Sequence, residues 1–289
     1  MNLFSKFIDK LKELGSGWIL NGSLLLLISI CFLSWRYVLT GDNGFAELFN
    51  RQTWIDGKDF ISLLMGSGLG PDSAFLSKSS WSLAIRLSVN TLWMSILAIS
   101  IASFAVVLTF IPASRSVAID DSGAKTNWPS LLLFALVRSV FLFSRSVPEL
   151  VWAMLILFVF APGIIVAAVA LAIHNYGVLG RLSSEIVENM DQRPIRSIRS
   201  AGAGWGQVLI YGIIPQAMPQ FVTYALYRWE VIIRTTVVVG FVAAGGLGMH
   251  FRLNMSYQHF DDVGMLICCY LILVLFVDTL SATLRRLVR

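Results

Sequence analysis

Long apolar segments separated by short polar segments set the pattern of this chain. Most of the apolar segments approach or exceed the roughly 20 residues that a helix needs to cross the hydrocarbon core of a bilayer. Pro112 ends one of them, and Pro162-Gly163 forms a tight turn between two others. We therefore predict an all-α, polytopic membrane protein with six transmembrane helices, at residues 18–39, 84–111, 147–161, 164–180, 213–240 and 262–284.

The apolar segment 129–145 is assigned from charge and not from length. Arg138 and Arg145 are seven residues apart on one helical face, as in an interfacial helix. If this segment crossed the membrane, the basic loop at Arg193–Arg199 would lie outside, against the excess of Lys and Arg that marks cytoplasmic loops. We therefore predict an inner-surface helix that leads through Pro148 into the third span.

The composition indicates a membrane protein and excludes a soluble one. Of the 289 residues 56% are hydrophobic and only 13% are charged, whereas a soluble domain carries about a quarter charged residues. The net charge of +5 lies mainly in loops and ends, so it indicates topology and not nucleic-acid binding. We expect both termini in the cytoplasm, the basic segment 1–17 at the inner face, and the polar loop 40–82 outside. The three cysteines lie in apolar segments, which predicts free thiols and no metal site.

The longest polar interruption in the second half of the chain is residues 193–216. Pro194 suits the first turn of a helix, and Pro215 begins the next apolar segment. Three arginines recur every third residue on roughly one helical face, and three glycines then end the helix: Arg193, Arg196 and Arg199, followed by Gly202, Gly204 and Gly206. This pattern predicts a docking surface at the membrane edge. The alternative is a basic loop that only follows the charge rule.

Charged residues inside apolar segments cost at least about 2.5–3.5 kcal/mol each at mid-helix, so they require an explanation. The fifth span carries Arg228, Glu230 and Arg234. Glu230 and Arg234 are four residues apart and can pair along one helical face. The positive charge that remains would favour an anion in a pore, and guanidinium groups bind two oxygens of a phosphate-like group at once. A buried structural ion-pair network is the alternative.

Three weaker signals lie elsewhere in the apolar segments. Arg145 and Glu149 flank Pro148 and form a candidate hinge or ligand site, whereas the alternative is a snorkelling arginine before a proline-started helix. His174 is either a hydrogen-bonded buried histidine or a proton relay. The glycine-rich run Phe241–Gly248 allows close approach of another backbone.

The spacing of the basic loop resembles the cytoplasmic motif E-A-A-x3-G-x9-I-x-L-P of ABC-importer permeases. Gly202 and Pro215 match its glycine and proline, whereas Gly212 and Ile214 replace its isoleucine and leucine, and Arg196-Ser197-Ile198 stands where the motif has E-A-A. Five segments occur in the order of one such family: R-S-V-P-E-L-V-W-A, A-L-A-I-H-N-Y-G-V-L-G, the loop with P-Q-A-M-P-Q-F, L-Y-R-W-E-V-I-I-R, and A-A-G-G-L-G. Over roughly 84–284 the chain resembles the permease subunit of phosphonate-type ABC importers, although Ala243 stands where that family usually has glycine.

The resemblance implies a type I ABC importer permease fold in a bacterial inner membrane. It implies an N-terminal part at 1–83 and a five-helix core at 84–289 with a coupling loop at 181–212. The implied partners are a cytoplasmic ABC ATPase dimer, a second permease subunit and a periplasmic binding protein, and the implied cargo is phosphonate, phosphite or hypophosphite. The chain lacks the G-x-x-x-x-G-K-[ST] loop, so ATP and Mg are expected on the ATPase, with no cofactor and no enzymatic activity here.

The resemblance also implies roles for individual residues. The expected ATPase-coupling residues are Arg196, Arg199, Ser200, Gly202 and Pro215. The expected residues of the translocation pathway are Arg145, Glu149, Arg228, Glu230 and Arg234.

Two other functions remain open at this level. A methionine- or betaine-type permease would share the loop. A membrane-embedded enzyme would need grouped carboxylates or histidines, but Glu149, His174 and Glu230 are far apart in the sequence. The sequence also leaves open which oxyanion is carried, and whether the second permease subunit is a copy or a paralogue.

Overall fold

The computed structural model describes residues 15–40, 49–67, 73–114 and 128–288, and nearly all of these residues are helical. The chain divides into two compact units, residues 1–62 and 63–289, so the division precedes the expected boundary at residue 83. Most of the basic segment 1–17, parts of the outer loop 40–82 and most of the inner loop 113–128 lie outside the described residues.

The first unit contains α2 (Gly15–Thr40) and most of α3 (Arg51–Leu64). Residues Asn21–Thr40 have a mean hydropathy of 1.8, and their length suits a helix that crosses a bilayer. Helix α2 therefore corresponds to the predicted first span.

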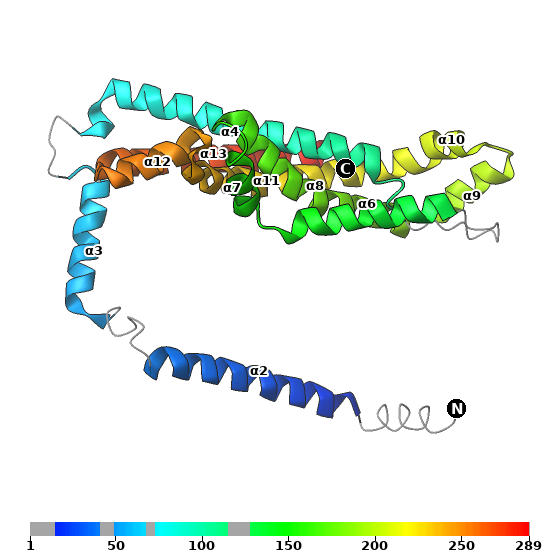
Figure 1. Cartoon of the computed structure of the whole chain (residues 1–289), viewed down its shortest axis with the longest axis horizontal. Helices are drawn as coiled ribbons and strands as arrows, with labels where there is room; N and C mark the ends of the chain where they lie inside the picture. The colour runs from blue at the N-terminus through cyan, green and yellow to red at the C-terminus, as the bar shows by residue number, and fades with distance from the viewer. Residues whose placement is uncertain (1–14, 41–48, 68–72, 115–127, 289) are drawn as a thin grey trace. The chain divides into compact units, whose positions relative to one another are not determined.

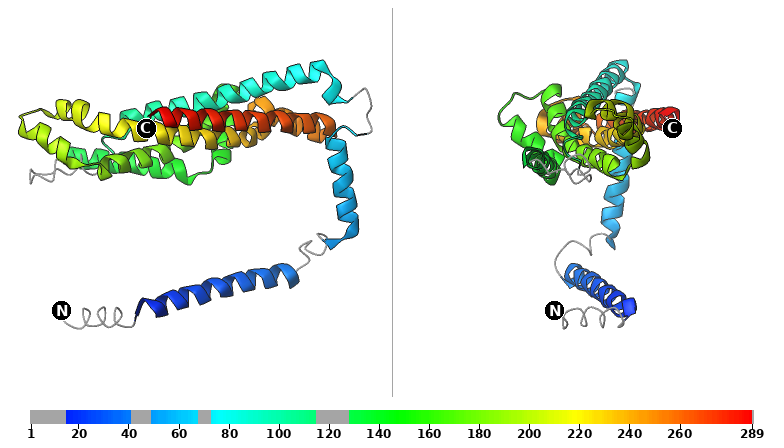
Figure 2. Two further views of the ribbon diagram at one scale, coloured as in Figure 1. Left: turned by 180° about the vertical axis from the view of Figure 1, so that it is seen from behind. Right: turned by 90° about the vertical axis from the view of Figure 1, so that its right-hand side faces the viewer.

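The second unit is a bundle of long helices that run alongside one another (Figure 1; Figure 2). The long helices are α4 (Lys78–Thr109), α6 (Trp128–Ser146), α8 (Ile164–Asn189), α11 (Ile214–Val239) and α13 (Phe260–Val288). The shorter helices are α7 (Glu149–Leu157), α9 (Gln192–Ser200), α10 (Trp205–Val208) and α12 (Gly246–Ser256). Helices α9 and α10 together occupy one end of the bundle (Figure 1).

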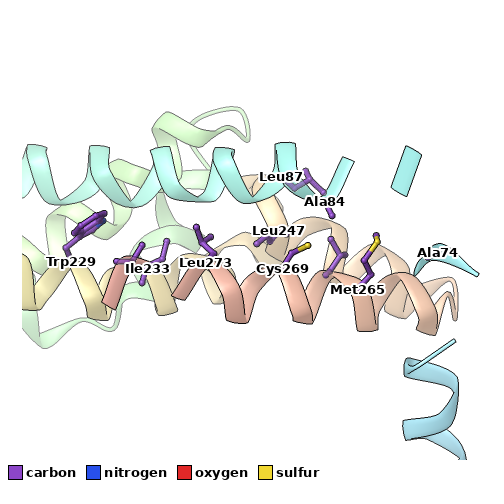
Figure 3. Packing of buried hydrophobic residues seen from close by; sticks show 11 residues of the cluster. Ala74, Ala84, Leu87, Trp229, Ile233, Leu247, Met265, Cys269 and Leu273 are labelled. Atoms are coloured by element: carbon purple, nitrogen blue, oxygen red, sulfur yellow. The ribbon is translucent and has the colours of Figure 1, made fainter. Parts of the chain in front are cut away.

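One part of the core joins α4, α11, α12 and α13 (Figure 3). Its side chains lie between the ribbons of α4 and α13 and include Leu87, Trp229, Ile233 and Leu273. The indole Nε1 of Trp229 donates a hydrogen bond of 3.1 Å to the buried hydroxyl of Ser95. This cluster fixes α11 against α4 and α13, since Trp229 and Ile233 are buried there.

Helices α6 and α8 cross at glycine. A Cβ atom on Gly177 would lie 2.5 Å from the carbonyl oxygen of Phe141 and 2.7 Å from the backbone nitrogen of Arg145. A Cβ atom on Gly180 would meet the ring of Phe141. Small residues allow membrane helices to approach closely, so these two glycines set the distance between the helices that carry Arg145 and His174.

The predicted close backbone approach in the glycine-rich run is confirmed. Gly245 and Gly246 have φ values of 94° and 68°, in the left-handed region that favours glycine. A Cβ atom on Gly248 would meet the carbonyl oxygen of Val237, and one on Gly240 would lie 2.8 Å from the Cα of Gly248. The turn therefore folds α12 tightly against the end of α11.

Within the described residues, five helices are long and apolar enough to cross a membrane, and α11 with α12, a bent pair, makes a sixth if the pair is one span. The predicted spans one, two, four and six correspond to α2, α4, α8 and α13, and the predicted fifth span lies in α11 of the bent pair.

The assignment of the third span needs a correction. The segment predicted as an inner-surface helix is α6, with 19 residues and a mean hydropathy of 1.3, and it qualifies as a span. The predicted span at 147–161 contains only the nine-residue helix α7, because Pro148 separates it from α6. Because α6 takes the place of the predicted crossing at 147–161, the number of candidate crossings before the basic loop stays the same.

Candidate functional site

The basic helix α9 is amphipathic and short. Asp191 caps it by accepting a hydrogen bond of 3.0 Å from the backbone nitrogen of Arg193. Ile195 is buried, and Ile198 packs with it against residues that lead into α11, including Val208 and Ile213. The isoleucine side chains of α9 therefore pack the helix against the bundle.

The outer face of α9 is polar and exposed. Arg196, Arg199 and Ser200 all lie on this face. The Ser200 hydroxyl donates a hydrogen bond of 3.0 Å to the carbonyl of Arg196, which belongs to the same helix. The predicted basic helix is therefore confirmed as a structural element, and its cationic face is open to another molecule.

The predicted bend lies at Gly202, whose φ is 87°. Its backbone nitrogen donates to the carbonyl of Arg199 at 2.9 Å, which closes the helix end in the manner typical of a left-handed glycine. Gly204 precedes α10, where its backbone nitrogen donates to Oε1 of Gln207 at 2.9 Å. Gly206 lies inside α10 and does not break the helix, contrary to the prediction.

Pro215 lies in the first turn of α11, where the fixed φ of proline suits the helix. A π-helical turn, Leu209–Ile213, precedes it, so the helical path from α10 into α11 is almost continuous. A Cβ atom on Gly212 would lie 3.4 Å from the side chain of Ile198. The π-helical turn before α11 and the isoleucine face of α9 are thus in direct contact, which would transmit a displacement of α9 to α11.

A buried polar cluster joins α7, α8 and α11. Arg228 donates through Nε to Oδ1 of Asn175 at 2.9 Å, and its NH2 group lies 3.5 Å from Oε1 of Glu149. The amide of Asn175 donates to the carbonyl of Leu171 at 2.7 Å and, more weakly, to Glu149 at 3.4 Å. Nε2 of His174 lies 3.7 Å from the same carboxylate, while its Nδ1 is 2.9 Å from the Val147 carbonyl.

The contacts of His174 and Glu149 bear on two of the alternatives. Nδ1 of His174 meets a backbone carbonyl, which fits a hydrogen-bonded histidine. Glu149 pairs with Arg228, although Arg145 is its neighbour four residues away, and the pairing fastens α7 to α11. The positive charge of Arg228 is therefore compensated inside the protein.

The other two charges of α11 pair with α13. NH1 of Arg285 lies 2.5 Å from Oε1 of Glu230, and NH2 of Arg234 lies 2.7 Å from Oδ2 of Asp278. The predicted pairing of Glu230 with Arg234 is wrong, because each side chain reaches across to α13. The side chain of Glu230 is 12% exposed, whereas that of Arg234 is 50% exposed, so only the second pair is accessible from outside the bundle.

Arg145 belongs to a separate group on α6 and α8. It lines a small pocket together with Arg138, Phe141, Leu142, Arg181 and Ser184. Arg138 pairs with Glu188 and donates to the Ala113 carbonyl at 3.0 Å. The structure thus brings Glu149 and Arg228 together and leaves Arg145 outside that cluster.

Sequence reasoning missed Asn175, Asp278 and the role of Arg285 as a counter-ion. Asp278 is an acidic residue within an apolar segment, so the rule that singled out the charges of α11 would also have found it. Asn175 carries no charge, and only its complete burial between two charged residues shows its importance. Arg285 lies in the basic C-terminal end of the chain, and only its position beside Glu230 shows its role as a counter-ion.

The described part of the chain contains no group of three or more His, Cys, Asp and Glu side chains that could hold a metal ion. Glu149 and His174 do meet, but both take part in the cluster around Arg228. The charged groups of these sites form ion pairs that join neighbouring helices.

Comparisons with known proteins agree with this geometry. Residues 122–289 match the family described as "Binding-protein-dependent transport system inner membrane component". The phosphite transport system permease protein of Stutzerimonas stutzeri is 31% identical over 96% of this chain and 92% of its own length. The phosphate-import permease protein of Mycolicibacterium smegmatis is 28% identical over 81% of this chain and 41% of its own length. The inward-facing MetNI methionine ABC transporter is similar in fold, with a TM-score of 0.61, 17% identity, and coverage of 74% of this chain and 99% of that one.

Proposed function

The chain belongs to the family of binding-protein-dependent transport system inner membrane components, and on that premise we propose that it is the permease subunit of an ATP-driven importer for a small phosphorus oxyanion. It is a multi-pass inner-membrane protein and a transporter subunit, not an enzyme. The similarity to a phosphite permease over nearly the whole of both chains supports this class of cargo. The similarity to the methionine transporter concerns the fold alone.

The observation that carries the proposal is the exposed basic face of α9 at one end of the bundle (Figure 1). A cytoplasmic ATPase dimer would receive this face in a groove, with both chain termini on the same side of the membrane. Arg196, Arg199 and Ser200 would contact the ATPase, while Gly202 and Pro215 would fix the angle between α9 and α11. The buried isoleucines then carry the motion into the bundle.

A passage for the anion would run along the accessible seam between α11 and α13. Arg234 is half exposed there, and its partner Asp278 is 33% exposed. A guanidinium that can exchange a carboxylate for an oxyanion provides weak, reversible attraction, which conduction requires. The buried residues Glu149, Arg228 and Glu230 would keep the helices beside the passage in fixed positions. A second permease subunit, identical or paralogous, would complete the passage, and an external binding protein would deliver phosphonate, phosphite or hypophosphite.

The function is tested by the ATPase rate of the purified assembly in lipid nanodiscs. The assembly is mixed with binding proteins loaded with phosphite, methylphosphonate, hypophosphite, methionine or glycine betaine. We expect stimulation by a phosphorus-loaded binding protein only. Stimulation by the methionine- or betaine-loaded protein alone would overturn the cargo class, and an assembly that purifies without any ATPase would overturn the role as a permease subunit.

A further inference from the structure

Three arginines from two helices line one small pocket. Arg138 and Arg145 come from α6, and Arg181 comes from α8; Phe141, Leu142 and Ser184 complete the lining. The two arginines of α6 are seven residues apart, so they stand about 10 Å from one another along the helix at 1.5 Å per residue. The close crossing at Gly177 brings Arg181 next to them.

The local carboxylates do not balance these arginines. Glu188 pairs with Arg138, and Glu185 accepts from Nε of Arg181 at 2.7 Å. Within the described residues, Arg145 has neither a hydrogen-bond nor an ion-pair partner, although its side chain is only partly exposed. Two carboxylates against three guanidinium groups leave one positive charge, and a partly buried charge without a partner is costly. An external anion would remove this cost.

The surroundings of the pocket are apolar. Leu142 and Phe143 are 55% and 63% exposed, although both belong to a helix that qualifies as a membrane span. Arg181 lies eight residues before the end of α8, about 12 Å along the helix from the turn into α9. The pocket therefore combines a cationic centre, in the half of α8 that leads to α9, with an open apolar surface along α6.

We propose that this pocket, formed by Arg138, Arg145 and Arg181, binds the phosphodiester headgroup of an anionic phospholipid, whose acyl chains follow the exposed apolar side of α6. Basic pockets between transmembrane helices on the cytoplasmic side are suited to such headgroups. Guanidinium forks offer two parallel hydrogen bonds to the two free phosphate oxygens. The bound lipid would fasten α6 to α8 beside the helix that leads into α9. The inference does not depend on the identity of the transported anion.

Native mass spectrometry of the purified assembly tests the proposal. The detergent-solubilised protein is titrated with phosphatidylglycerol, cardiolipin or phosphatidylcholine, and the fraction that retains lipid is measured. We expect retention of the two anionic lipids and not of phosphatidylcholine. Arg145→Gln should weaken this retention about fivefold, which corresponds to the contribution of one arginine near an anionic lipid surface. Arg145→Lys keeps the charge and should restore part of it.

Arg286→Gln is the matched control, because it removes one positive charge from the exposed end of α13 and leaves the pocket intact. Equal lipid retention by Arg145→Gln and Arg286→Gln would overturn the proposal. A parallel titration with inorganic phosphate separates a lipid from a free anion: displacement of the lipid by millimolar phosphate would assign the pocket to a soluble oxyanion instead. If Arg145→Gln does not assemble, Arg181→Gln in the same titration decides the question.

Discussion

Replacing Asp278 by Asn tests whether the seam between α11 and α13 faces water. The substitution preserves the shape of the side chain and leaves Arg234 without its counter-ion. In the native protein the two groups lie 2.7 Å apart, and Arg234 is 50% exposed. If a hydrated passage runs along this seam, water solvates the guanidinium, and the loss is that of an exposed pair, about 0–1 kcal/mol in the free energy of unfolding.

The surroundings of Asp278 also keep the stability cost of Asp278→Asn low. Oδ1 of Asp278 is buried and has no hydrogen-bond partner in the described protein. A carboxylate oxygen in that position carries a desolvation cost that the neutral amide reduces. If the seam faces lipid instead, an unpaired arginine costs at least about 2.5–3.5 kcal/mol.

Glu230→Gln is the internal reference. Glu230 and its partner Arg285 are 12% and 22% exposed, so this substitution leaves a buried guanidinium unpaired and should cost about 3–5 kcal/mol. Both variants and the wild type are unfolded with denaturant in the same detergent, and their unfolding free energies are compared. A loss for Asp278→Asn as large as that for Glu230→Gln would refute the hydrated seam and, with it, the passage along Arg234.

Three further outcomes follow from the contacts described above. Arg228→Ala should abolish most transport and cost about 3–5 kcal/mol of stability, because it leaves the Glu149 carboxylate buried beside Asn175; uptake measured at equal amounts of assembled protein checks this, and normal uptake would contradict it. Gly177→Ala should destabilise the fold by about 1–3 kcal/mol, because its Cβ would meet backbone atoms of α6; Gly212→Ala, which makes only ordinary contacts, is the comparison in thermal unfolding. Arg196→Glu should reduce co-purification of the ATPase at least tenfold while lipid retention is unchanged, and undiminished co-purification would show that the face of α9 does not bind it.

The predictions that succeeded rest on local properties of the chain. Apolar length alone identified most of the membrane-crossing helices, because every backbone group in a bilayer must be satisfied within its own segment. The basic helix α9 and its end at Gly202 followed from proline, periodic arginines and a glycine in the right order. The close approach at Gly245 and Gly246 followed from the conformational freedom of glycine.

The break between α6 and α7 shows where local reasoning reached its limit. The charges of Arg138 and Arg145 favoured an interfacial helix, but Glu188 from another helix pairs with Arg138 and removes the need for water at that position. Pro148 then separates two helices, where the sequence suggested a simple entry into a span. The lengths of the two helices, 19 residues for α6 and nine for α7, then decide which segment is long enough to cross.

The sequence by itself determined the class of the protein, most of the candidate spans and the position of the basic helix α9, since these depend on hydropathy and on residues a few positions apart. The tertiary structure decided which charge meets which. Glu230 pairs with a residue 55 positions away and Arg234 with one 44 positions away, although the two lie within one turn of each other. Two opposite charges four residues apart on one helix can pair on its surface. The free energy of an ion pair, however, depends on burial and on the neighbouring helix, and only the packed bundle determines both.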